Sequence, residues 1–189
     1  MDDLISEIKE CQLCQNELPL GANPVVQASS ESKIAIIGQA PGVKVHQSGI
    51  PWDDKSGDNL RNWLGVGKEE FYDKHSFALI PMGFCYPGTG KSGDFPPMKI
   101  CALMWHQKLF QRMLNVKVTL LVGQYAQRYY LKKERKETLT LTVQSYTDYL
   151  PEYFPLPHPS PRNNIWQSKN PWFKAEVLPY LKSRISDII

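Results

Sequence analysis

The sequence lacks the features that would place it in a membrane or outside the cell. No run approaches the about 18 apolar residues that a membrane-spanning helix needs. The first residues, Met1-Asp-Asp-Leu-Ile-Ser-Glu, have neither the basic start nor the apolar stretch of a secretory signal. No internal repeat or low-complexity tract interrupts the 189 residues. We therefore expect one domain over residues 1–189, a monomer in the cytoplasm with no membrane partner.

The sequence also has no large excess of positive or negative charge. The chain has 22 Lys and Arg against 19 Asp and Glu, a net charge of +3. Such a balance permits contact with a polyanion through a local basic patch but does not demand it. Hydrophobic residues at 42% and charged residues at 22% are the composition of an ordinary globular protein.

Cysteine is rare, and its positions are informative. The only four are Cys11, Cys14, Cys85 and Cys101, a CxxC pair and two residues far downstream. Without a secretory signal, an even set of this kind favours a metal or cluster site over disulfides. Four thiolates suit an iron–sulphur cluster or a structural zinc ion. The alternative is that each cysteine is a small buried hydrophobe.

Apolar runs alternate with helical patterns along the chain. Strands are predicted at 33–38, 77–82, 116–123 and 154–158, and helices at 3–11, 58–64, 97–114, 124–131 and 172–185. This alternation predicts an α/β domain with a central, mostly parallel sheet. Ligands of such sheets bind outside the carboxyl ends of the strands.

Two loops at predicted strand ends carry candidate chemistry. Gly38-Gln-Ala-Pro-Gly42 forms a tight turn whose backbone N–H groups can face a ligand, or simply joins a strand to a helix. His158-Pro-Ser-Pro-Arg162 holds an imidazole, a hydroxyl and a guanidinium on a stiff backbone. A neutral imidazole held in this way can donate a hydrogen bond to a leaving group. Ser160 and Arg162 suit phosphate oxygens. The alternative for this loop is a surface turn with a solvated histidine.

These motifs, with Gly49-Ile-Pro-Trp52 between them, resemble the signature elements of the uracil-DNA glycosylase superfamily. The cysteine spacing is similar to that of its iron–sulphur (family 4) branch. The resemblance implies a three-layer α/β/α fold with a four-stranded sheet and a structural 4Fe–4S cluster, with zinc as the alternative. It also implies hydrolysis of the N-glycosidic bond of a base flipped out of DNA, so that DNA with a damaged or deaminated base is the expected partner.

The resemblance assigns roles to individual residues. Gln39 and Ala40 fall where the family binds the base, and Trp52 falls where an aromatic ring stacks on it. His158 falls on the histidine that stabilises the departing base. Gln39 is placed to orient the attacking water, and Asp53 or Asp54 is the nearest substitute for a missing carboxylate. A core position for Trp52 and a solvated helix-entry pair for the two aspartates are the alternatives.

Two departures from the family leave the activity open. The iron–sulphur branch has a carboxylate where Gln39 stands, and the first family of the superfamily has one where Ala40 stands, but neither carboxylate is present here. The stretch Ile80-Pro-Met-Gly-Phe-Cys85 also lacks the asparagine with which the family reads uracil. A glycosylase, a non-catalytic DNA-binding module and a small-nucleoside hydrolase or binding protein therefore all remain. The stretch Gly88-Thr-Gly-Lys-Ser-Gly93 lacks the first glycine of a phosphate-binding loop, but Lys91 in it suits contact with DNA phosphate.

Overall fold

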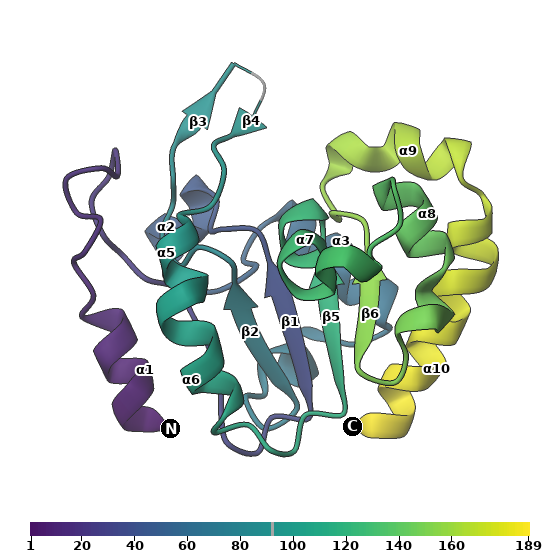
Figure 1. Ribbon diagram of the computed structural model, residues 1–189, viewed down its shortest axis with the longest axis horizontal. Helices are drawn as coiled ribbons and strands as arrows, with labels where there is room; N and C mark the ends of the chain where they lie inside the picture. The colour runs from purple at the N-terminus through teal and green to yellow at the C-terminus, as the bar shows by residue number, and fades with distance from the viewer. Residues whose placement is uncertain (92) are drawn as a thin grey trace.

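The computed structural model describes residues 1–91 and 93–189. Its centre is a sheet of four parallel strands in the spatial order β2-β1-β5-β6 (Figure 1). The strands are β1 (Ile34–Gly38), β2 (Phe77–Pro81), β5 (Val118–Val122) and β6 (Tyr153–Leu156). All four predicted strands are present, and the sheet expected to be mostly parallel is parallel across every pair. All carboxyl ends therefore meet at one edge, the upper edge in Figure 1.

Burial on both faces explains why the strands are continuous apolar runs. Every residue of β1 and of β5 is buried. Alternate residues point to opposite faces, so Ala35 and Ile37 join one core while Ile34 and Ile36 join the other. The expected three-layer α/β/α architecture is confirmed.

Two sets of helices cover the two faces of the sheet (Figure 1). One face is covered by α1 (Asp2–Lys9), α5 (Lys99–Cys101), α6 (Gln107–Phe110) and α7 (Gln124–Leu131). The other is covered by α3 (Lys55–Leu64), α4 (Lys68–Tyr72), α8 (Leu139–Gln144) and α10 (Leu178–Ile188). Leu4 and Ile8 of α1, the helix predicted at 3–11, enter the first core.

The helix predicted over 97–114 is shorter and less regular than expected. It starts at Lys99, widens to a π-helix at Ala102–His106 and ends at Phe110. The wider turn carries the buried His106 toward the sheet. A second π-helical turn, Phe173–Val177, precedes α10.

Several short elements were missing from the sequence prediction. They are α2 (Val43–Ser48), α4, α8, α9 (Asn164–Lys169) and the hairpin of β3 (Thr89–Gly90) and β4 (Gly93–Asp94). Each has too few residues to show a clear apolar period. In the expected loop Gly88–Gly93, Ser92 lies outside the described residues. Among the described helices, none is long and apolar enough to cross a membrane.

Candidate active site

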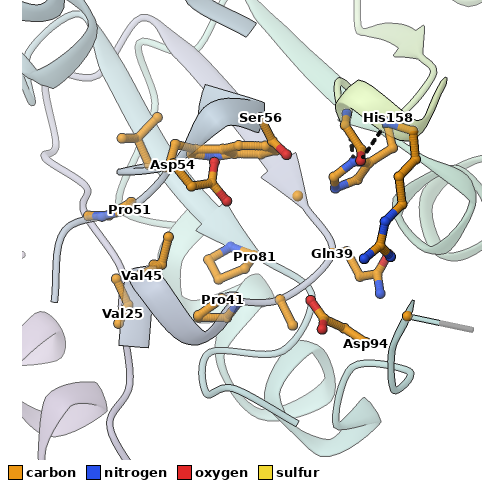
Figure 2. A pocket seen from close by; sticks show the side chains of 18 of the residues that line it. Val25, Gln39, Pro41, Val45, Pro51, Asp54, Ser56, Pro81, Asp94 and His158 are labelled. Carbon is orange, nitrogen blue, oxygen red and sulfur yellow. Dashed lines mark hydrogen bonds between the residues drawn. The ribbon is translucent and has the colours of Figure 1, made fainter. Parts of the chain in front are cut away.

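A cavity of about 580 Å³ opens at the carboxyl edge of the sheet (Figure 2). Its size is within the usual range for small-ligand sites. The loop after β1, the segment leading into α3, the hairpin and the loop after β6 all contribute to its wall. The lining includes Gly38, Gln39, Ala40, Pro41, Gly42, Trp52, Asp54, Ser56, Pro81, Asp94, Gln124, His158, Ser160, Arg162 and Asn163. The motif loops expected at strand ends therefore lie around one space.

The protonation state of His158 follows from its surroundings. Burial lowers the pKa of His158 below 6.5, and the charges of Asp54 and Asp94 oppose this shift. The imidazole is therefore neutral at pH 7. The Ser160 backbone N–H donates to Nδ1 over 3.2 Å, so the ring proton lies on Nε2. The cavity is thus lined by a neutral ring whose Nε2–H can donate to a ligand.

Two asparagine side chains hold the histidine loop. Asn163 Nδ2 donates to the His158 carbonyl over 2.7 Å, and Asn59 Nδ2 of α3 donates to the Pro159 carbonyl over 2.9 Å. Together with the two prolines, these bonds hold the imidazole in place without help from a ligand.

Trp52 has a strained backbone that aims its ring at the cavity. Its φ is +59°, in the left-handed region that a bulky residue rarely adopts. A Cβ on Gly38 would lie 2.7 Å from Trp52 Cζ2, so only glycine at the end of β1 admits the indole there. A Cβ on Gly57 would lie 1.8 Å from the Trp52 carbonyl oxygen. The indole and the His158 ring lie 6.0 Å apart, centroid to centroid.

The two adjacent aspartates have different places. Asp54 lines the cavity, and Asp53 does not. Asp54 caps α3, because its Oδ1 accepts the Gly57 backbone N–H over 2.8 Å. Its second oxygen remains for a ligand.

Gln39 and Ala40 lie on the same wall, next to an apolar floor. The Gln39 carbonyl accepts the Gly83 backbone N–H over 3.0 Å, and the Gly38 carbonyl accepts that of Met82 over 2.9 Å. These bonds extend the β1–β2 pairing into the loop. The Gln39 side chain is left half-exposed at the cavity (Figure 2).

The three candidate phosphate ligands are distributed around the mouth. Ser160 and Arg162 line the cavity, and Arg162 Nη1 lies 3.0 Å from where a Cβ on Gly93 would stand. Arg162 therefore reaches the hairpin. Lys91 is exposed on that hairpin and does not line the cavity.

Sequence reasoning missed four lining residues with polar side chains: Ser56, Asp94, Gln124 and Asn163. Asn163 immediately follows the histidine motif and Gln124 follows β5, so extending the strand-end rule by one residue would have found both. No signal in the sequence marked Asp94, because a two-stranded hairpin brings it to the site.

The four cysteines line another, smaller pocket, which shares no lining residue with this cavity. Cys11, Cys14, Cys85 and Cys101 all line it, together with apolar residues such as Leu18 and Trp105. The pKa of the Cys85 thiol is raised to about 11, chiefly by burial and to a smaller extent by the charges of the other three thiols. A bound cation would relieve that repulsion and favour the thiolates.

The spacing of the thiols limits what they can hold. In the ranges 1–91 and 93–189, no three His, Cys, Asp or Glu side chains are grouped closely enough to hold a metal ion. A four-iron cluster is larger than one ion, so its thiolate ligands stand farther apart than those of zinc. Four soft donors around one pocket fit such a cluster in chemistry and number.

Comparison with known protein families gives a match over most of the chain. The family model described as "Uracil DNA glycosylase superfamily" matches residues 25–182. The matched range includes the whole sheet, the cavity and both motif loops. It includes Cys85 and Cys101 but begins after Cys11 and Cys14, so it covers two of the four cysteines.

Proposed function

This chain belongs to the uracil DNA glycosylase superfamily, and on that premise we propose that it hydrolyses the N-glycosidic bond of uracil or another deaminated base in DNA. The base is flipped out of the helix into the 580 Å³ cavity. The observation that carries the proposal is the neutral His158, whose Nε2–H is available at the carboxyl edge of the sheet.

The cavity residues divide the work by their chemistry. Trp52 offers a flat face on which a planar base stacks. As the glycosidic bond breaks, negative charge develops on the base, and His158 donates a hydrogen bond to it. Positive charge develops on the sugar, where the Asp54 carboxylate stabilises it. Gln39 accepts and donates hydrogen bonds, so it orients the base edge or the attacking water.

DNA phosphates bind at the mouth of the cavity. Arg162 and Ser160 border it, and Lys91 is exposed on the neighbouring hairpin. A guanidinium and a backbone-anchored hydroxyl are common phosphate ligands. With a net charge of only +3, the binding should depend on this local patch.

We also propose that the four cysteines hold one 4Fe–4S cluster, with zinc as the alternative. The shared pocket and the all-thiolate donor set support this. Such a group would fasten the segment after α1 to the loop after β2 and to α5, and it takes no part in the chemistry.

The test is base release from defined oligonucleotides. Single- and double-stranded DNA carrying uracil, hypoxanthine or xanthine is incubated with the protein and then treated with alkali, which breaks the strand at an abasic site. Strand breaks at one of these bases would support the proposal. The matching oligonucleotide with an undamaged base is the control.

Gln39 and Ala40, which replace the family carboxylate, favour a second candidate, a DNA-binding module without catalysis. It would give a mobility shift without strand breaks. Cleavage of free nucleosides alone would instead indicate a small-nucleoside hydrolase.

A further inference from the structure

The hairpin β3–β4 brings a carboxylate to the cavity from outside the motif loops. It projects past the carboxyl edge of the sheet in Figure 1, and Asp94 at the end of β4 lines the cavity. In Figure 2, Asp94 and Asp54 enter from opposite sides, with Gln39 and His158 along one flank.

A chain of hydroxyl groups holds Asp94 in one orientation. Thr89 Oγ1 donates to Asp94 Oδ1 over 2.5 Å. Because Thr89 has a single hydroxyl hydrogen, the buried Tyr86 O–H must be the donor in its 2.6 Å bond to Thr89 Oγ1. This arrangement leaves Asp94 Oδ2 for a ligand.

The free oxygens of Asp94 and Asp54 border the same space. A Cβ on Gly42 would lie 3.8 Å from Asp94 Oδ2 and 4.0 Å from Asp54 Oδ2. The negative charges of both carboxylates also favour the protonated form of His158, against the effect of burial. Two acids therefore face one histidine across a gap that glycine keeps open.

The two carboxylates are not equivalent. Asp54 accepts the Gly57 backbone N–H and thereby caps α3, so its carboxylate has a structural role at the start of that helix. Asp94 accepts one hydroxyl hydrogen from Thr89. Asp94 caps no helix and lines the cavity from the hairpin, so the proton-accepting role is assigned to Asp94.

We propose that Asp94 is the catalytic base that replaces the carboxylate absent from the Gly38–Gly42 loop. This role rests on the proposed function. The oxygen of a water molecule bonds to C1′ of the sugar while the C1′–N bond breaks, and the bonding pair leaves with the base. One proton of the water passes to Asp94, and the base anion departs hydrogen-bonded to His158 Nε2–H. Asp94 then returns its proton to solvent.

The experiment compares Asp94→Asn with the parent protein in base release from the best oligonucleotide substrate. General base catalysis contributes about 100- to 10,000-fold, so we expect release to fall at least about 100-fold with DNA affinity kept. The acid limb of the pH–rate profile should disappear with the carboxylate. Asp187→Asn, an exposed acid near the far end of α10, is the control and should keep the parental rate.

Gly42→Ala and Thr89→Val keep the proposal falsifiable if Asp94→Asn fails to fold. Gly42 has φ −78°, and a Cβ there would have no neighbour closer than 3.8 Å, so alanine fits without strain. Its methyl group would fill the gap between the two carboxylates. We expect release to fall at least about tenfold in Gly42→Ala with an unchanged melting temperature, and less in Thr89→Val, which only loosens Asp94.

The outcomes separate this inference from the proposed function. An active parent with an equally active Asp94→Asn protein would overturn the role of Asp94 and leave the glycosylase standing. A parent that releases no base from any substrate would overturn both.

Discussion

At the residue scale, two buried histidines have different tasks because their hydrogen-bond partners differ. His158 is neutral and presents Nε2–H to a cavity. His106 is neutral too, but both of its nitrogens have protein partners: Nε2 donates to the Pro81 carbonyl over 3.0 Å, and Nδ1 accepts from the Tyr130 hydroxyl over 2.7 Å. Burial alone therefore does not mark a functional histidine. A donor left for a ligand does.

His158→Ala should lower base release at least about tenfold, because the departing base loses its hydrogen-bond donor. DNA affinity should stay close to the parental value, since phosphate contacts carry most of it. Single-turnover kinetics with a separate binding titration would measure both. His75→Ala, which removes an exposed imidazole, is the control. A His158→Ala protein with the parental rate would show that the imidazole has no catalytic part.

Trp52→Ala should weaken binding of a flipped base by about 1–3 kcal/mol, the usual value of stacking on one base. Binding to intact duplex should change less. Fluorescence anisotropy with lesion-containing and intact DNA would compare the two. Trp172→Ala, at a half-buried tryptophan outside the cavity lining, is the matched control. Equal losses on both DNAs would mean that Trp52 serves the core and not the base.

At the element scale, the π-helical turn Ala102–His106 supports the cavity wall from behind. It places His106, 2% exposed, between Tyr130 of α7 and Pro81 at the end of β2. Pro81 is itself part of the cavity floor. Two hydrogen bonds of the His106 ring therefore connect α7, on one face of the sheet, with Pro81 at the cavity.

Burial lowers the pKa of His106 from 6.5 to about 4. Between these values the unfolded chain binds a proton that the native protein does not, so stability falls as the pH drops. The expected loss of unfolding free energy is about 3 kcal/mol. Urea denaturation from pH 7 to pH 4 would measure it, and His106→Gln should show a flatter dependence because glutamine does not titrate. The same pH dependence in both proteins would contradict the assignment.

At the scale of the whole molecule, the four cysteines line one pocket although they come from segments far apart in sequence. Cys11 and Cys14 follow α1, Cys85 follows β2, and Cys101 ends α5. A group bound by all four would hold three parts of the first helical layer together. Tyr86, the residue after Cys85, donates the first of the two hydroxyl hydrogen bonds that lead to Asp94. The loop that carries Cys85 therefore also supports the hairpin.

Cys11→Ser should therefore lower the iron content of anaerobically purified protein and its melting temperature together, because a metal stabilises the folded state that binds it. Metal analysis and thermal unfolding would be measured on the same samples. Leu20→Ala alters an exposed residue of the segment after α1 that does not line the cysteine pocket, and it should change neither. A parent protein with neither iron nor zinc would rule out the cluster and its zinc alternative.

The amino-acid sequence by itself determined the sheet and the place of the site. Runs such as 33–38 have no polar face, so they can only be buried between two layers, and the loops that follow parallel strands must meet at one edge. Tertiary structure alone decided which of Asp53 and Asp54 faces the cavity, which nitrogen of His158 keeps its proton, and that Asp94 joins them. These outcomes depend on a helix cap, a backbone hydrogen bond and a hairpin, each formed between residues close in the sequence. The sequence did not reveal them, because a side chain faces the cavity only once its segment packs against the edge of the sheet.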